Sequence, residues 1–422
     1  MFEEELQHLL ESWKKAFRQY SNNKMEAEKE VVRWEWTNGE RYNPLPYHFV
    51  RFPGRGRILK DSPKSIGNYF LYGFDEQNRV CLHEEYEYKR YLPANILQKM
   101  FRREDLSKEL FSEHFYHYLP DRVEVFGFSA APHTPIPLSI HQIFFEKGKV
   151  KFFGSFRVNG YSPVYSEKGA DPEHFYKWLG PNGRFINAEA YIYEGKRLKA
   201  ISGYSEVPGI GPHSWQEQFM YNEAGTLLSI DRVFNNGQKQ AVYRKRKKGQ
   251  TFQDIREEAT NKLVEAITQR VRAANIQEKV YCIELSYNKF AEQFPPCIIV
   301  TPESYRSKIL QSRNSRDRLC IFSPIFENEW FFTIEDPKTT ELCEILEQEI
   351  RAGDRWDEAT SILREVAAIL THQDWANVLD TTSDFVVFAL DPELEGQDII
   401  EILRSSVSEK QIQEWVDKGW LM

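Results

Sequence analysis

The chain has 422 residues, of which 41% are hydrophobic and 28% are charged, and these proportions are ordinary for a globular protein. This length suffices for two or three domains that each bury a core. No apolar run approaches the roughly 20 residues needed to cross a bilayer, and the first residues lack the basic and apolar regions of a signal peptide. The composition therefore predicts a cytoplasmic protein that does not enter the membrane.

Charge is divided unevenly along the chain. The net charge is −8, but residues 1–248 contain 37 Lys and Arg against 31 Asp and Glu, a net of +6. Residues 249–422 contain 18 against 32, a net of −14. An acidic region repels nucleic acid and attracts basic partners, so we expect a protein partner and no nucleic acid.

Residues 3–19 predict an amphipathic helix. Their apolar residues recur at intervals of three and four and form one stripe: Leu6, Leu9, Leu10, Trp13 and Phe17. Residues 92–118 predict a second, interrupted helix. Within it, His114 and His117 have the i, i+3 spacing that puts two imidazoles on one helical face. Two ligands rarely make a metal site, so we interpret this segment as the aromatic end of a helix and predict no metal.

A short pattern recurs four times in the first half of the chain. Aromatic residues lead to an acidic or amide turn, then to a Gly or Asn, and then to an aliphatic residue where alternation resumes. The copies lie at residues 72–80, 144–150, 191–198 and 219–227. Gly and Asn tolerate the positive φ that a tight turn needs, so each copy predicts a β-hairpin. Residues 121–246 are consequently predicted to be strand and turn almost throughout.

The composition changes at the basic run 244–248, and we place a domain boundary at about residue 250. We interpret the run as a solvated linker that pairs with the acidic domain. Helices are predicted from residue 254 and over residues 338–351, 355–371, 397–405 and 408–418. Strands are predicted over residues 280–287, 297–301, 319–322, 330–334 and 384–390. Because the last strand is apolar throughout, both of its faces should be covered.

These elements predict an α+β chain of two domains. Residues 1–250 form an N-terminal antiparallel β-hairpin meander with flanking helices. Residues 251–422 form an acidic, mixed α/β domain. Repetition of a hairpin favours an extended sheet, and extended sheets usually bind other molecules rather than catalyse reactions.

Catalytic signatures are absent from the sequence. Glu284, Asp384 and Asp391 lie in or beside apolar strands, where burial could raise the pKa of a carboxyl group and support hydrolysis. No nucleophile elbow, triad order or metal-binding spacing accompanies them, and the five cysteines lack CxxC spacing. We therefore predict no catalytic residue and no cofactor.

The aromatic residues of the hairpins are candidates for a binding surface. Their rings could stack on sugars or hold a peptide, but cross-strand aromatic pairs also stabilise a sheet simply by packing. The predicted partner-binding residues are these aromatics and two strand-end aspartates: Tyr72, Phe74, Tyr191, Tyr193, Phe219, Tyr221, Asp384 and Asp391.

Two resemblances bear on function. The hairpin unit at residues 219–228 resembles the YD (Rhs-type) repeats of bacterial polymorphic toxins, with Asn222 in place of the acid and Thr226 in place of the arginine. The segments 384–391, 399–407 and 415–421 are similar to the end of a family of uncharacterised bacterial proteins that occur among the immunity proteins of toxin systems. This second resemblance implies a domain that binds a toxin, and it transfers no catalytic residue.

The sequence therefore predicts a non-enzymatic, protein-binding protein of the immunity or antitoxin type, whose partner is a cognate toxin. Two alternatives remain open. One is a hydrolase or toxin with a carboxylate-based site in the C-terminal domain, and the other is a carbohydrate- or peptide-binding β module. The sequence does not determine the oligomeric state.

Overall fold

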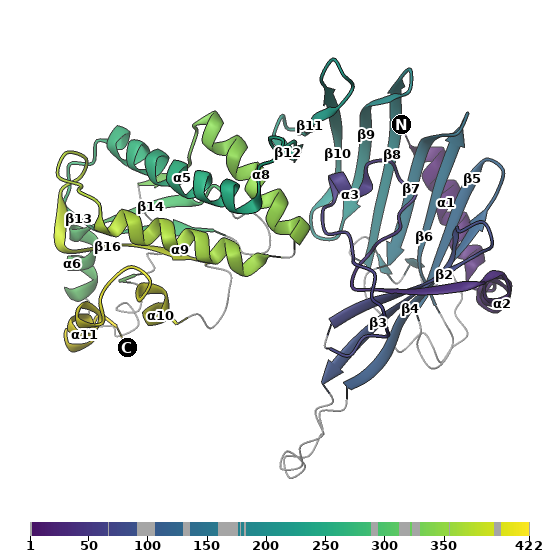
Figure 1. Ribbon diagram of the computed structural model, residues 1–422, viewed down its shortest axis with the longest axis horizontal. Helices are drawn as coiled ribbons and strands as arrows, with labels where there is room; N and C mark the ends of the chain where they lie inside the picture. The colour runs from purple at the N-terminus through teal and green to yellow at the C-terminus, as the bar shows by residue number, and fades with distance from the viewer. Residues whose placement is uncertain are drawn as a thin grey trace, which may run out of the picture. The chain divides into compact units, whose positions relative to one another are not determined.

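The computed structural model describes most of the chain as two compact units, Met1–Val242 and Tyr243–Met422, and each is described by itself. The sequence analysis put the division at about residue 250. The described residues are 2–65, 67–90, 106–129, 136–158, 176–177, 179–180, 183–287, 294–311, 321–322, 330–353, 355–391 and 398–421. Figure 1 labels the helices and strands of both units.

Within the described residues of the first unit, twelve strands follow one another in chain order and form a single sheet. The strands are β1 (Arg33–Thr37), β2 (Gly67–Phe74), β3 (Val80–Arg90), β4 (Leu106–Tyr118), β5 (Arg122–Ser129), β6 (Pro137–Glu146), β7 (Lys149–Val158), β8 (Arg184–Glu194), β9 (Arg197–Val207), β10 (Gly211–Tyr221), β11 (Leu227–Phe234) and β12 (Lys239–Arg244). Figure 1 shows neighbouring strands of this sheet, such as β8, β9 and β10, side by side. From β1 to β11 each strand pairs antiparallel with the next. The predicted antiparallel meander is therefore confirmed.

The four predicted hairpins are confirmed, and they share their geometry. In each, the register shifts at an aromatic residue just before the turn, between 73 and 74, 144 and 145, 192 and 193, and 220 and 221. Each turn also contains a residue with positive φ: Asn78 (61°), Gly148 (74°), Gly195 (58°) and Gly225 (80°). The extra residue of the bulge and the left-handed residue of the turn together reverse the chain.

The acidic or amide residue of the pattern has a structural function in two of these turns. The Asp75 Oδ1 atom accepts a hydrogen bond from the Arg79 amide at 2.8 Å, and the Asn222 Oδ1 atom accepts one from the Thr226 amide at 2.8 Å. A fifth turn of this kind, which the sequence analysis missed, closes with a bond from the Phe234 amide to the Gln238 carbonyl oxygen (2.9 Å). Hydrogen bonds between residues close in the sequence therefore close these turns.

Replacing Asn222 with alanine should lower the free energy of unfolding by about 1 kcal/mol, because the Thr226 amide loses its acceptor. Asn222→Asp keeps the acceptor and should stay close to the wild type. The matched control is Glu223→Ala, at the next, exposed position of the same turn. Denaturant unfolding of the three variants measures the difference, and an equal loss in the alanine and aspartate variants at position 222 would contradict it.

One face of the sheet, called the helix face below, is covered by α1 (Glu3–Ala16) and α2 (Tyr20–Glu30). The predicted N-terminal helix is confirmed, and its Leu9 and Trp13 are buried against the sheet. The Trp13 indole Nε1 donates a hydrogen bond to the Pro137 carbonyl oxygen at 2.9 Å. Helix α2 was not predicted because it has no apolar stripe: only Asn23 and Ala27 of it are buried.

The predicted helix over residues 92–118 is wrong where the structure describes it. Residues 106–118 form strand β4, and residues 92–105 lie outside the described residues. The reason is that both faces of β4 are covered, so apolar and aromatic residues occur on both. Phe115 is buried on the helix face, and the register places His114 and Tyr116 on the opposite face. A strand covered on two sides loses the alternation that identifies a strand.

The opposite face, called the loop face below, is covered by residues 38–60, which include α3 (His48–Arg51). Tyr42 packs edge-on against Tyr72 and Phe74, with ring centroids 5.0 Å apart in each case. At the other end of this cover, the buried guanidinium of Arg51 binds Glu189 on β8 and Glu217 on β10. Residues far apart in the sequence therefore anchor this segment to the sheet.

In the described part of the second unit, four strands form a mixed sheet in the order β15-β14-β13-β16, with β13 and β16 parallel. The strands are β13 (Val280–Ser286), β14 (Cys297–Pro302), β15 (Phe331–Phe332) and β16 (Thr381–Leu390). The helices are α5 (Phe252–Ala274), α6 (Glu303–Gln311), α8 (Pro337–Gly353), α9 (Trp356–His372), α10 (Ile399–Leu403) and α11 (Glu409–Asp417). Of the predicted strand 319–322, residues 321 and 322 form a turn and the others lie outside the described residues.

Strand β16 is covered on both faces, as its apolar sequence predicted. Phe385, Val387 and Ala389 join the core that contains α5, α8 and α9. The alternate residues, Val386 and Phe388 among them, join the core that contains α6, α10 and α11. None of the described helices of the protein is long and apolar enough to cross a membrane.

The basic run at the start of the second unit is paired with acidic residues of that unit. Arg244 Nε lies 2.8 Å from a Glu344 oxygen, and Arg246 Nη1 lies 3.2 Å from a Glu349 oxygen. Both glutamates are on α8. The pairing agrees with the interpretation of the run as a linker that neutralises part of the acidic surface.

Candidate functional site

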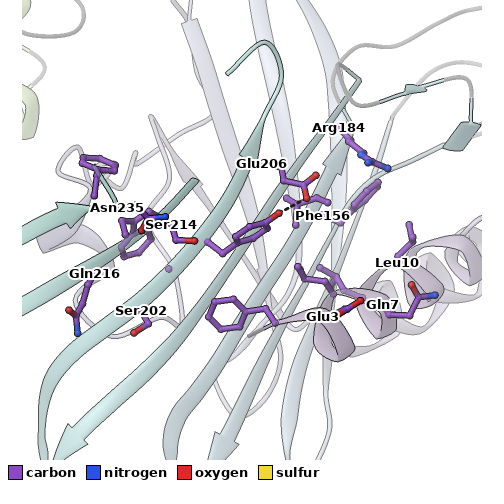
Figure 2. A pocket seen from close by; sticks show the side chains of 18 of the residues that line it. Glu3, Gln7, Leu10, Phe156, Arg184, Ser202, Glu206, Ser214, Gln216 and Asn235 are labelled. Carbon is purple, nitrogen blue, oxygen red and sulfur yellow. Dashed lines mark hydrogen bonds between the residues drawn. The ribbon is translucent and has the colours of Figure 1, made fainter. Parts of the chain in front are cut away.

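A groove lies on the helix face of the first unit, between α1 and strands β7–β11, and its volume is about 830 Å³. Figure 2 shows the helix on one side of it and the strands on the other. The lining residues are Phe2, Glu3, Leu6, Gln7, Leu9, Leu10, Phe156, Tyr176, Arg184, Ile186, Ser202, Gly203, Tyr204, Glu206, Ser214, Trp215, Gln216, Val233, Phe234 and Asn235. The volume is in the range of cavities that hold small organic molecules, roughly 300–1,000 Å³.

The wall of the groove on the side of α1 is apolar. The amphipathic pattern of the helix turns Leu6 and Leu10 toward the sheet, and both pack against its core. Phe2 is buried just before the helix and packs against Phe152 on β7, with ring centroids 5.8 Å apart. Phe156, also on β7, lines the groove as well. This wall suits the aliphatic or aromatic part of a ligand.

The wall formed by the strands is polar. Ser202 and Tyr204 on β9 are directly opposite Gln216 and Ser214 on β10, so four polar side chains share one face of the sheet. On the other face of β9 a Cβ at Gly203 would lie 2.1 Å from the Trp215 ring, so that ring fits over β9 only because residue 203 is glycine. The polar groups of the groove therefore sit on a rigid, fully paired part of the sheet.

Two charged side chains of the strands, Arg184 and Glu206, lie toward the same end of the groove. Figure 2 places Arg184 and Glu206 toward one end and Ser202 and Gln216 toward the other. The Tyr204 hydroxyl donates a hydrogen bond to Glu206 Oε1 at 2.6 Å, and burial together with this bond raises the pKa of Tyr204 to about 12. Arg184 donates to the Tyr176 hydroxyl, whereas its buried Nε atom has no hydrogen-bond partner among the residues that the structure describes. The Nε atom is therefore free to donate to an acceptor group of a ligand.

None of the eight partner-binding residues predicted from the sequence lines this groove. Tyr72, Phe74, Tyr191 and Phe219 are buried. The aromatics at positions 193 and 221 are half-buried, and the Tyr221 hydroxyl donates to the Leu198 carbonyl oxygen at 2.8 Å. A partner could reach the four buried rings only after other parts of the unit moved, and a partner-binding role for them stays a prediction.

The three carboxylates singled out in the second unit are not brought together. Asp384 and Asp391 are seven residues apart along and just beyond β16, which corresponds to roughly 20 Å. Asp384 accepts a hydrogen bond from Arg306 at 2.8 Å, and although burial opposes it, this ion pair lowers the pKa of the carboxyl. Burial raises the pKa of Glu284 to about 7. An ion pair thus shifts the pKa of Asp384 down, whereas burial shifts that of Glu284 up.

The pair His114 and His117 is also separated. On a helix they would share a face, but on β4 positions three apart point to opposite faces. His117 packs edge-on against Phe126, whose ring belongs to the core of the helix face, while His114 lies on the loop face and stacks on His83 of β3. The prediction that the two histidines share a face is therefore wrong, because it assumed a helix where the structure has a strand.

The sequence analysis missed the groove. Its polar wall is visible in the sequence only as the alternation Ser202-x-Tyr204-x-Glu206 and Ser214-x-Gln216, which any strand with one solvated face also shows. The site depends on the register of β9 with β10 and on the position of α1, about 190 residues earlier in the chain. These are properties of the tertiary structure.

Comparisons with known proteins add little to this description. No family model matches the chain. No curated protein matches it either. Among solved structures, it is similar to a porin-like protein from Bacteroides vulgatus ATCC 8482, with a TM-score of 0.24 and 10% sequence identity over 50% of this chain and 95% of that chain. We draw no conclusion about fold or function from a similarity at this level.

Proposed function

We propose that the first unit binds a small amphipathic molecule in the groove between α1 and strands β7–β11. The observation that carries this proposal is the division of the groove into an apolar wall from α1 and a polar wall from β9 and β10. Pockets for small molecules typically combine an apolar lining with a few fixed polar groups that set the orientation of the ligand.

The chemistry of the two walls defines the ligand class. An aliphatic chain or aromatic ring would pack against Leu6 and Leu10. Hydroxyl or amide groups would exchange hydrogen bonds with Ser202 and Gln216, and an anionic or carbonyl group would accept from the Arg184 Nε atom. A molecule with all three features is an amphipathic acid of moderate size.

The test uses two fluorescent probes, the anionic anilinonaphthalene sulfonate and the neutral N-phenylnaphthylamine, titrated into the full chain. Both should bind saturably at one site. Ser202→Phe should abolish binding of both, because the larger ring fills the groove. Arg184→Gln should weaken the anionic probe about tenfold and leave the neutral probe unchanged, since a hydrogen bond to a charged group contributes about 1.5 kcal/mol.

The matched control is Arg197→Gln, at the turn between β8 and β9 and outside the groove lining. It should bind both probes as the wild type does. Saturable binding that survives Ser202→Phe would place the probe elsewhere and contradict the proposal, as would an equal effect of the two arginine substitutions.

The immunity-type role predicted from the sequence is a second proposal, and the net charge of −14 in residues 249–422 supports it. An acidic unit would associate quickly with a basic toxin, and ionic strength would weaken that association. Affinity capture at low and at high salt, followed by mass spectrometry, tests it. A stoichiometric toxin lost at high salt is the expected result, and the lack of a protein partner at either salt would count against this role.

A further inference from the structure

Three potential metal ligands meet on the loop face of the first unit, away from the groove. His83 and Glu85 are two residues apart on β3, so their side chains point to the same face of the sheet. His114 on β4 is directly opposite His83 in the register. The ligand atoms of the three residues all lie within 4.8 Å of one another. Two neighbouring strands thus present two imidazoles and one carboxylate to one point.

Two of the distances between donor atoms suit ligands of one shared ion. The Nε2 atoms of His83 and His114 each lie 3.5 Å from Glu85 Oε1, and the two rings stack with centroids 4.1 Å apart. A tetrahedral ion with ligands at about 2.1 Å holds its donor atoms roughly 3.4 Å apart. The imidazole lone pairs lie in the ring planes, so the two stacked rings would have to rotate for both nitrogens to point at one ion.

The hydrogen bonds of His83 provide a second, independent observation. His83 is only 8% exposed, and among the described residues its buried Nε2 atom makes no hydrogen bond of good geometry, although it lies 3.5 Å from Glu85 Oε1. The Nδ1 atom of the same ring lies 3.0 Å from the Tyr116 hydroxyl. A ring held through one nitrogen, with the other nitrogen close to a carboxylate, is compatible with a metal-ligating histidine and its supporting residue.

We propose that His83, Glu85 and His114 bind one divalent transition-metal ion of the zinc class. Two imidazole nitrogens and one carboxylate oxygen are donors that suit zinc and its neighbours in the first transition row, and calcium or magnesium prefer oxygen ligands. An imidazole nitrogen binds such an ion through its lone pair, so each ring must offer an unprotonated nitrogen to the site.

The site has access from solvent and a free coordination position. The Glu85 side chain is 31% exposed, which leaves a path for the ion. Three protein ligands leave the fourth position of a tetrahedral ion open, whereas structural zinc sites use four protein ligands. A further polar group lies here, since the Ser112 Oγ atom is 3.1 Å from His114 Nε2. The ion would therefore keep a water molecule or take a ligand group at this position.

The experiment titrates zinc chloride into the full chain after treatment with a chelator, by calorimetry, and repeats the titration with cobalt for its visible spectrum. The wild type should bind one zinc ion per chain, and the cobalt complex should show the intense absorption of a four-coordinate ion. His83→Asn, His114→Asn and Glu85→Gln should each weaken zinc about 100-fold or more. Tyr116→Phe should weaken it about tenfold, since it removes the support of the His83 ring.

His117→Asn is the matched control, because His117 is on the same strand but on the helix face. It should bind zinc as the wild type does. If the two histidine variants fail to fold, as circular dichroism would show, Glu85→Gln and the cobalt spectrum of the wild type decide, since Glu85 is partly exposed. The proposal is overturned if the wild type binds no zinc, if binding is unaffected by the Glu85 substitution, or if His117→Asn weakens zinc as much as His114→Asn does.

Discussion

Replacing Arg51 with methionine should lower the free energy of unfolding of the first unit by about 3–5 kcal/mol, because it leaves two buried carboxylates without their shared cation. The Arg51 side chain is fully buried, as is that of Glu217, and that of Glu189 is only 3% exposed. Removing one member of a buried ion pair costs much more than removing an exposed one, since the remaining charge has no solvent to compensate it.

The geometry explains why this site should be so sensitive. Arg51 Nη1 and Nη2 bind the two oxygens of Glu189 at 2.9 and 2.7 Å, and its Nε binds Glu217 at 2.6 Å. Attraction to Arg51 holds the pKa of Glu189 below its usual value although burial opposes this. Glu217 also accepts a hydrogen bond from Arg232 at 2.6 Å and would keep this cationic partner. The loss of Arg51 should therefore destabilise the charged form of Glu189 more than that of Glu217.

The effect in the first unit is measured by adding denaturant and following the amide hydrogen exchange of strands β8–β10. The double variant Arg51→Met with Glu189→Gln should recover part of the loss, because it removes the stranded charge. Arg55→Met is the control, since Arg55 is exposed on the same covering segment and should change the stability by less than about 0.5 kcal/mol. A double variant as unstable as the single one would show that packing of the Arg51 side chain, and not charge, is what matters.

Replacing Glu284 with glutamine should raise the free energy of unfolding of the second unit by about 3 kcal/mol above pH 7 and change nothing at about pH 4. Glu284 is 3% exposed on β13, between Ile299 of β14 and Phe388 of β16. Burial raises its pKa from 4.5 to about 7, and a hydrogen bond with Ser286 reduces this shift only in part. Each unit of pKa corresponds to about 1.4 kcal/mol.

The sign follows from proton binding. Because its pKa is raised on folding, Glu284 holds its proton more tightly in the folded chain than in the unfolded one. Below about pH 4.5 both states are protonated and the group costs nothing. Between pH 4.5 and about 7 the unfolded state loses the proton first, so stability falls as the pH rises, and above pH 7 the full penalty is present. Glutamine keeps the shape of the side chain and removes this dependence.

Urea unfolding of wild type and variant at several values between pH 4 and 8 tests this. The two should converge at the acidic end and diverge steadily up to neutral pH. Glu341→Gln, an exposed carboxylate on α8 of the same unit, is the control and should follow the wild type. A difference between wild type and the Glu284 variant that does not change with pH would show that the carboxyl is not the cause.

Local sequence was a good guide wherever the interactions that decide the structure are themselves local. Hydrogen bonds within five residues close the hairpin at Asn222. The glycine at position 225 indicates the positive φ that this turn needs. Strand β16 is apolar on both faces because helices cover both, and a run of apolar residues carries that information. The same holds for α1. Its apolar stripe predicts a helix packed on a core, whichever elements form that core.

Sequence reasoning failed at β4, and the failure propagated to the candidate sites. Phe115 and His114 are adjacent in the chain and lie on opposite, covered faces, so the strand shows no simple alternation. Once the segment was interpreted as a helix, His114 was paired with His117 and not with His83. The partner of His114 is 31 residues earlier in the chain, and only the antiparallel register of β3 with β4 brings the two together.

The amino-acid sequence by itself therefore determined the antiparallel meander, its four repeated turns, the first helix, most elements of the second unit and the acidic charge of residues 249–422. Only the tertiary structure decided the groove under α1, the link from Arg51 to Glu217 across 166 positions, and the cluster of His83, Glu85 and His114. The physical reason is the range of the interactions. Turns and amphipathic stripes arise from neighbours along the chain, whereas binding sites form where strand register and helix docking bring distant side chains within a few ångströms of one another.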